Sequence, residues 1–159
     1  ANVTTLYSNN HNLAMCLSYT DLLIGAVLIP GSKAPKLIKK DMLSIMKKGS
    51  VIVDVAVDQG GCTETCKPTT HKEPTFIIDD VVHYCVSNMP GAVARTSTRA
   101  LNNATLPFIM EIADKGYKRA MEENSHLMEG LNIHKGSVTY EAVANDLGHD
   151  YIAPKKVLA

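Results

Sequence analysis

The sequence lacks a surplus of charge of either sign, and it lacks a long hydrophobic run. It contains 16 basic and 16 acidic residues, so its formal net charge is zero. A chain with no net charge lacks the excess of positive charge that attracts nucleic acid or an anionic membrane surface. No apolar stretch approaches the roughly 20 residues of a membrane-spanning helix. We therefore expect neither nucleic acid nor a membrane as a partner.

The chain also lacks an initiator methionine and the basic and apolar regions of a signal peptide. Its start, "ANVTTLYSNN", predicts a fragment, a processed product or a trimmed chain. Internal repeats and low-complexity tracts are absent. A length of 159 residues allows one domain or two small pieces, and a hydrophobic content of 45% is ordinary for a packed domain.

The chain has four cysteines, and their spacing does not complete a zinc site. Cys16 and Cys85 have apolar neighbours, which predicts small buried side chains. Cys62 and Cys66 form a C-x3-C pair in a polar loop, which zinc or a disulfide could use, but no second pair supplies four ligands. We therefore expect two free thiols in a cytoplasmic protein and no metal site.

Apolar runs alternate with helical stripes over the first 88 residues. The pattern predicts strands at 3–8, 21–29 and 50–57, and one strand or two short ones within 75–88. It predicts helices at 9–19 and 34–49, with a long polar loop at 58–74. Strands that are apolar on both faces and alternate with helices are typical of an α/β fold with a parallel sheet covered on both sides.

The alternation stops near residue 95, and the rest of the chain is mainly helical. Residues 99–131 predict helix with Pro107 at a kink or at the start of a second helix, and a short helix is predicted at 140–147. We therefore expect two parts, residues 1–94 and residues 95–159.

Three predicted strands end in residues that suit a binding site. Asp58 precedes Gly60 and Gly61, and Pro30-Gly31 and Asn88-Met89-Pro90-Gly91 follow two other strands. The carboxyl ends of parallel strands share one edge, where ligands bind. A carboxylate there can bind a ribose hydroxyl, transfer a proton or hold a metal. The alternative is that Asp58 caps a turn and the glycines supply positive φ. The shared edge favours a functional role.

With these residues in view, the chain resembles the C-terminal half of the alanine dehydrogenases, a family related to the NAD-binding subunit of proton-translocating transhydrogenase. The matching stretches are "DLLIGAVLIPGSKAPKL", "MKKGSVIVDVAVDQGG", "PTTHKEPTF", "VVHYCVSNMPGAV", "RTST" and "ALNNATLPF". The resemblance implies a reversible, NAD-linked oxidative deamination of L-alanine to pyruvate and ammonium. It implies that residues 1–94 are the second half of a Rossmann-type NAD domain, and that residues 95–159 return to the catalytic domain.

The resemblance also implies roles for single residues. Asp58 matches the catalytic aspartate, with a proton-transfer role near the nicotinamide. The implied cofactor contacts are Ser8, Val27, Leu28, Val55, Ala56, Val57, Asp58, Lys67, Val86, Ser87, Asn88 and Met89. Some relatives bind magnesium through a Glu and a His four residues later, but here Lys115 follows Glu111 at that spacing, so we expect no metal there. Relatives form hexamers, which implies a homo-oligomer.

Several parts of the family's pattern are missing from this sequence. They are the G-x-G-x-x-G turn and its ribose-binding acid, the substrate-binding arginine and lysine, and the catalytic histidine. Without them the pyrophosphate loses its backbone donors, and the chemistry loses a second acid–base group. We therefore expect activity only with a complementary N-terminal polypeptide. Two alternatives are an inactive folding or assembly module and a transhydrogenase NAD subunit. "PTTHKEPTF" and the end at "KKVLA" favour the dehydrogenase over the latter.

Overall fold

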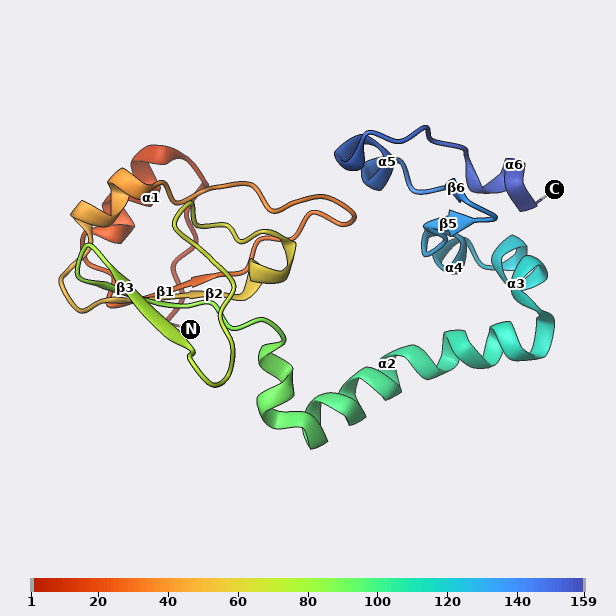
Figure 1. Ribbon diagram of the computed structural model, residues 1–159, viewed down its shortest axis with the longest axis horizontal. Helices are drawn as coiled ribbons and strands as arrows, with labels where there is room; N and C mark the ends of the chain where they lie inside the picture. Colours follow the sequence, from red (N-terminus) through yellow and green to blue (C-terminus); the bar gives the residue numbers. More distant parts are fainter. Residues whose placement is uncertain (1, 159) are drawn as a thin grey trace. The chain divides into compact units, whose positions relative to one another are not determined.

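The computed structural model describes residues 2–158, which group into two compact units (Figure 1). The first unit contains the residues up to Ile29 together with Lys33–Met89. The second contains Pro30–Ser32 and the residues from Pro90 onward. The outermost residues of the two expected parts, 1 and 159, lie outside the described part of the chain.

A four-stranded sheet with the order β1-β2-β4-β3 forms the centre of the first unit. Strands β1 (Leu22–Gly25), β2 (Val51–Asp54) and β4 (Val81–Tyr84) run parallel, and β3 (Thr75–Ile78) pairs antiparallel with β4. The turn between β3 and β4 has φ of 51° at Asp79 and 61° at Asp80, as a two-residue type I′ hairpin requires. The predicted α/β class is confirmed, and residues 75–88 hold two strands rather than one.

The predicted strands are longer than the observed ones, and the strand at 3–8 is wrong. Residues 3–7 are exposed and pair with no other described segment, and a strand needs a hydrogen-bonded neighbour. The strand predicted at 50–57 ends at Asp54, because the Asp54 side chain accepts a hydrogen bond from the Ala56 N–H at 3.1 Å. That bond turns the chain into the 3-10 helix η2 (Val55–Gln59).

The helix predicted at 34–49 is also wrong in extent, since only the 3-10 helix η1 (Lys40–Ile45) forms. The backbone N–H groups of Leu37 and Ile38 donate to the Cys62 carbonyl at 2.8 and 3.2 Å. The Ile38 carbonyl accepts from the Glu64 N–H at 2.8 Å. These bonds to a distant segment extend the chain, and the same groups cannot also close helical turns.

The core lies on one face of the sheet. The helix predicted at 9–19 is observed as α1 (Asn10–Leu17), which begins where the Asn9 side chain accepts from the Asn12 N–H at 2.8 Å. One buried core cluster consists of Leu17, Ile38, Leu43, Met46, Ile52 and Val81. On the other face Leu22, Ile24 and Ile77 are 56%, 59% and 68% exposed. The expectation of a sheet covered on both faces is therefore wrong for residues 2–158, because the packed helices α1 and η1 cover only one.

The second unit is mainly helical, as predicted. The 3-10 helix η3 (Met89–Val93) leads into α2 (Ala94–Lys115), a helix of 22 residues that contains Pro107. The remaining elements are α3 (Tyr117–Glu123), α4 (Ser125–Glu129), β5 (Ile133–His134), β6 (Ser137–Val138), α5 (Glu141–Leu147) and α6 (Pro154–Leu158).

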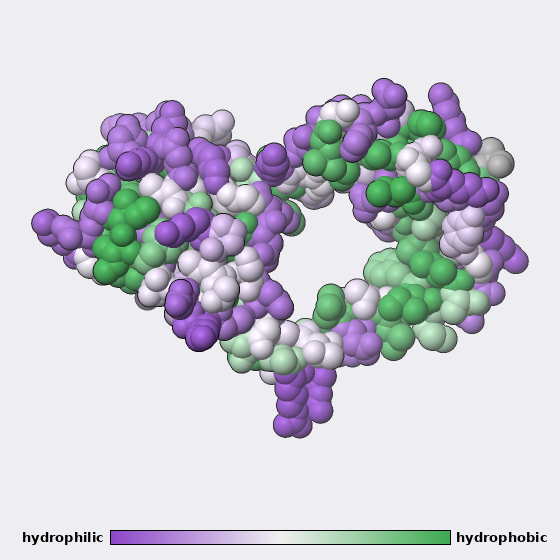
Figure 2. Space-filling model, viewed as in Figure 1, coloured by the Kyte–Doolittle hydropathy of each residue, from purple (hydrophilic) through white to green (hydrophobic). Residues whose placement is uncertain are grey.

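Helix α2 has no buried residue, and Figure 2 shows hydrophobic side chains along it. The helix predicted at 99–131 is divided at Gly116, which has φ of 74°, and at Asn124, whose side chain caps α4. Within residues 2–158, every helix is too short or too polar to cross a lipid bilayer.

Candidate functional site

Asp58 and Asn88 meet at the edge where β1, β2 and β4 end. Asp58 lies in η2, directly after β2, and Asn88 lies four residues after the end of β4. The Asn88 N–H donates to Asp58 Oδ2 at 3.3 Å. The parallel register places both residues at the carboxyl edge of the sheet. Pro30 and Gly31 group with the second unit instead.

The Asn88 backbone is held from its other side by a histidine. His71 Nε2 lies 3.0 Å from the Asn88 carbonyl oxygen. A carbonyl oxygen only accepts, so His71 donates from this nitrogen. Asn88 has φ of 55°, a conformation that asparagine tolerates better than most residues. His71, Asn88 and Asp58 thus form a chain of hydrogen bonds at the exposed rim.

An apolar pocket opens beside Asp58. Its volume is about 280 Å³. It is lined by Ala26, Val27 and Leu28 after β1 and by Val55, Ala56, Asp58 and Gln59 after β2. Five of these seven side chains are hydrocarbon, with one carboxylate and one amide. Such a lining suits a flat ring with a polar group at its edge.

The sequence reasoning missed Asp54, a fully buried carboxylate beneath this rim. It accepts hydrogen bonds from the N–H groups of Ala56 at 3.1 Å and Thr63 at 3.0 Å, and from the Cys62 thiol at 3.6 Å. A buried carboxylate needs such donors to offset its desolvation. The sequence does contain a pattern that indicates this role, because an acid inside the apolar run "VIVDV" has to find hydrogen-bond donors in the core.

A second missed residue is Lys36, whose ammonium contacts the loop after Asp58. It donates to the carbonyl oxygens of Gly60, of Gly61 at 2.9 Å and of Thr63 at 3.2 Å. The loop therefore turns N–H groups toward Asp54 and carbonyl groups toward Lys36. The run "PGSKAPK" contains no spacing that indicates this contact.

Three of the cysteines are packed beneath the same rim, and all four are free thiols. Cys62 lies in the predicted loop, and its side chain is buried. Burial raises the pKa of the Cys62 and Cys85 thiols, and it raises that of Cys66 well above the usual range, with further contributions from Cys85 and Asp54. Protonated thiols are poor nucleophiles and poor metal ligands.

The other predicted contact residues lie in several places. Val57 and Val86 are buried behind the rim, and the Ser87 N–H donates to the Thr69 carbonyl at 3.1 Å. Met89 begins η3. Ser8 lies in the exposed segment before α1, outside the pocket lining. Lys67 places its ammonium 4.5 Å from the centre of the Phe76 ring on β3.

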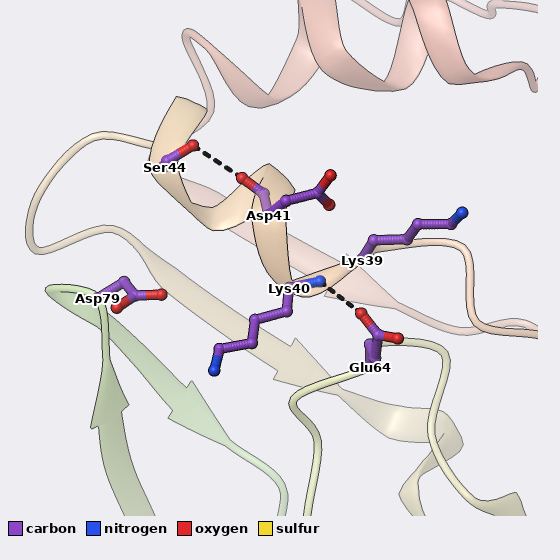
Figure 3. A pocket seen from close by; sticks show the side chains of 6 residues that line it. All are labelled: Lys39, Lys40, Asp41, Ser44, Glu64 and Asp79. Atoms are coloured by element: carbon purple, nitrogen blue, oxygen red, sulfur yellow. Dashed lines mark hydrogen bonds between the residues drawn. The ribbon is translucent and has the colours of Figure 1, made fainter.

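A larger cavity of about 560 Å³ lies elsewhere in the first unit (Figure 3). Asp79, in the hairpin before β4, is among its lining residues, so this cavity is at the opposite end of the sheet from Asp58. Its lining mixes two lysines with three acids, and one of these acids, Glu64, already accepts from the Lys40 N–H at 2.8 Å. The mixed charge gives it no clear preference for a ligand.

Glu111 in α2 forms ion-pair and amide contacts. Its Oε1 pairs with Lys115 at 2.8 Å, and its Oε2 accepts from the Asn124 amide at 2.8 Å. Hydrogen bonds from these two partners lower the pKa of Glu111. In the part of the chain that the structure describes, no three His, Cys, Asp or Glu side chains are arranged to hold a metal.

The sequence matches a family model described as "Alanine dehydrogenase/PNT, C-terminal domain" over residues 1–141. The chain belongs to the alanine dehydrogenase/PNT family. Among its relatives, the alanine dehydrogenase of Halomonas elongata is 60% identical over 148 residues, and that of Bacillus subtilis is 55% identical over 157 residues. These alignments cover 93% and 98% of this chain, but 40% and 42% of the relatives.

Solved structures of the alanine dehydrogenase/PNT family agree with this assignment. An L-alanine dehydrogenase matches 89% of this chain and 39% of its own, with a TM-score of 0.73 and 48% identity. A transhydrogenase from Sinorhizobium meliloti matches 83% of this chain and 35% of its own, with a TM-score of 0.60 and 26% identity. The chain thus spans about two fifths of the length of the curated relatives that it matches.

Proposed function

We propose that this chain supplies the C-terminal part of an enzyme that converts L-alanine, water and NAD⁺ reversibly to pyruvate, ammonium, NADH and a proton. The observation that carries the proposal is the Asp58 carboxylate, which accepts from the Asn88 N–H at 3.3 Å beside an apolar pocket. Identities of 60% and 48% to alanine dehydrogenases support this choice of reaction.

In this proposal Asp58 holds and moves a proton at Oδ1 or Oδ2. An ionised carboxylate accepts a proton, and its exposed position lets it pass that proton to solvent. The hydrogen bond from the Asn88 N–H fixes the direction of Oδ2. His71 supports this contact by donating to the Asn88 carbonyl at 3.0 Å.

The pocket fits one ring of a dinucleotide rather than the whole molecule. Its volume of about 280 Å³ is small for a complete ligand site. Val27, Leu28, Val55 and Ala56 would hold the ring by apolar contact. The backbone at Val57 and Val86–Met89 would border it, and Ser8 and Lys67 remain proposed contacts. When bound, NAD supplies the hydride acceptor.

The remaining contacts would come from a complementary N-terminal polypeptide. Relatives more than twice as long as the aligned region support this view. We further propose a cytoplasmic homo-oligomer, a hexamer by analogy with the family, in which the thiols stay reduced. The transhydrogenase alternative is weaker, because its structural match has a TM-score of 0.60 against 0.73.

The test is reconstitution with the N-terminal segment of the Bacillus subtilis relative that this chain does not span. We expect the assembled pair to form NADH when L-alanine is added, and the chain alone to form none. Asp58→Asn should lower kcat at least ~100-fold, since acid–base groups contribute that much. A well-assembled pair without activity would contradict the enzyme and favour the assembly module. Activity of the chain alone would overturn the requirement for a partner.

A further inference from the structure

The loop directly after Asp58 is bound along its length by the segment 34–38. The Ala34 N–H donates to the Gln59 carbonyl at 2.8 Å. The N–H groups of Leu37 and Ile38 donate to the Cys62 carbonyl. The carbonyls of Gly60 and Gly61 lie between these two points. In the described hydrogen bonds they receive no backbone donor from the segment 34–38, and both accept from the Lys36 ammonium instead.

Lys36 therefore completes a row of five consecutive carbonyl groups, from Gln59 to Thr63, that all receive donors from one segment. Gly60 and Gly61 have φ of 90° and 76°, so their backbone adopts a conformation that few residues tolerate. Glycine backbone is intrinsically free to move, and a cation shared by its carbonyls restricts it to one arrangement.

The opposite side of the loop is fixed by charge of the other sign. Buried Asp54 accepts from the N–H groups of Ala56 and Thr63, on either side of Asp58 and the two glycines. The loop is thus held between the Asp54 carboxylate, which accepts from its N–H groups, and the Lys36 ammonium, which donates to its carbonyls. Asp58 lies within this clamped stretch but contacts neither charged group in the described hydrogen bonds, so its carboxylate stays available at the rim.

We propose that Lys36 is a positioning residue, whose ammonium holds the Gly60-Gly61 turn so that Asp58 keeps its contact with the Asn88 N–H. This role rests on the proposed function of Asp58. The lysine acts through three backbone carbonyls, and among the described hydrogen bonds it has none to Asp58 or to a residue that lines the pocket. Its side chain is exposed, so removing it leaves no cavity in the core.

The first experiment compares Lys36→Ala and Lys36→Arg with Lys39→Ala in the reconstituted enzyme. Lys39 is a matched control, an exposed lysine three residues further along. We expect Lys36→Ala to lower kcat roughly tenfold to a hundredfold with little change in KM, because a small displacement of a reacting group has that cost. Added n-propylammonium should restore part of the loss, and neutral propanol should not. Lys36→Arg should retain more activity than Lys36→Ala.

The second experiment needs no activity and uses the 159-residue chain itself. We expect Lys36→Ala, but not Lys39→Ala, to shift the carbonyl ¹³C signals of Gly60 and Gly61 and the amide signal of Asn88, and propylammonium to reverse the shifts. Unchanged signals, or signals that propylammonium does not restore, would overturn the positioning role. If the signals respond but the assembled wild-type pair forms no NADH, the proposed function is wrong, and the role of Lys36 in holding the Gly60 and Gly61 carbonyls is still supported.

Discussion

His83 is a buried residue whose hydrogen bonds define its protonation state. The ring is fully buried in β4 and stacks on Phe76 with centroids 4.9 Å apart. Nδ1 lies 3.0 Å from the Val81 carbonyl, so it donates, and Nε2 accepts from the Thr65 hydroxyl at 2.8 Å. The neutral ring therefore satisfies both nitrogens. Burial lowers the pKa of His83, with the Val81 carbonyl and two acids opposing the shift.

We expect the first unit to lose stability as the pH falls below the usual histidine pKa of about 6.5. Above that pH the ring is neutral in both states, and its contribution is fully present. Below it the unfolded chain binds the proton first, so the free energy of unfolding falls until the pH passes the lowered folded pKa. Urea unfolding between pH 5 and 8, with NMR titration of the ring, measures the effect. Titration of the folded His83 ring at or above the usual histidine pKa would contradict the prediction.

Gly25, the last residue of β1, is required for steric reasons. A Cβ built there would overlap the Cys62 sulfur and lie 3.6 Å from Asp54 Oδ1. We expect Gly25→Ala to lower the free energy of unfolding by about 1–3 kcal/mol, the usual cost of overpacking. In a Cys62→Ala background the same substitution should cost less, because the clashing sulfur is gone. Urea denaturation of the wild-type protein and the three variants measures the coupling free energy between the two substitutions, and additive effects would show that this contact is not the cause.

At the scale of elements, the sequence predicted those parts of the fold that local chemistry determines. Helix α1 follows from its asparagine cap, and β2 and β4 follow from apolar runs. The segment 34–49 has a helical stripe, but its first half is extended by bonds to Cys62 and Glu64, which only the tertiary structure supplies. The meeting of Asp58 with Asn88 could be inferred from parallel strand ends. Lys36 could not, because its partners are backbone carbonyls in a loop 24–27 residues away, which neither a strand end nor a residue type marks.

The corner between α2 and α3 is held by a network of charges. Lys115 pairs with Glu111 and Glu123 at 2.8 Å each, and Arg119 pairs with Glu123 at 2.7 Å. Hydrogen bonds from Lys115 and Arg119 lower the pKa of Glu123 to about 2. A lowered folded pKa means that this contribution is present above the usual carboxyl pKa and is lost as the pH falls toward about 2.

We expect Lys115→Met to lower the Tm of the second unit slightly, since exposed ion pairs contribute little. The difference from wild type should shrink in high salt and below about pH 4, where the unpaired carboxylates become protonated. Calorimetry of the two proteins at several pH values measures it. Arg99→Met, a change of an exposed cation in the same helix, is the control. Equal effects of both substitutions, or a difference that persists in acid, would rule out the network.

At the scale of the whole molecule, the second unit begins with a long helix whose only described ion pairs and amide contacts to other elements lie near its end, at Glu111 and Lys115. Helix α2 has no buried residue, and its exposed apolar side chains are Leu101, Leu106, Phe108, Ile109 and Met110. Helical stability in proteins comes mostly from packing of an apolar face. A helix without that packing opens locally at low cost. This region should therefore be the first in the molecule to lose its structure.

We expect limited trypsin digestion to cut first at Arg95 or Arg99, in the exposed first turns of α2. The products should be one fragment ending there, which retains the sheet, and one containing α3–α6. Arg95→Gln combined with Arg99→Gln should delay both products without changing the thermal unfolding of the sheet. In the reconstituted enzyme the same bonds should be protected, because the proposed N-terminal polypeptide would cover the apolar side chains of α2. First cuts at Lys47 or Lys48 would instead show that the sheet unit is the weaker of the two.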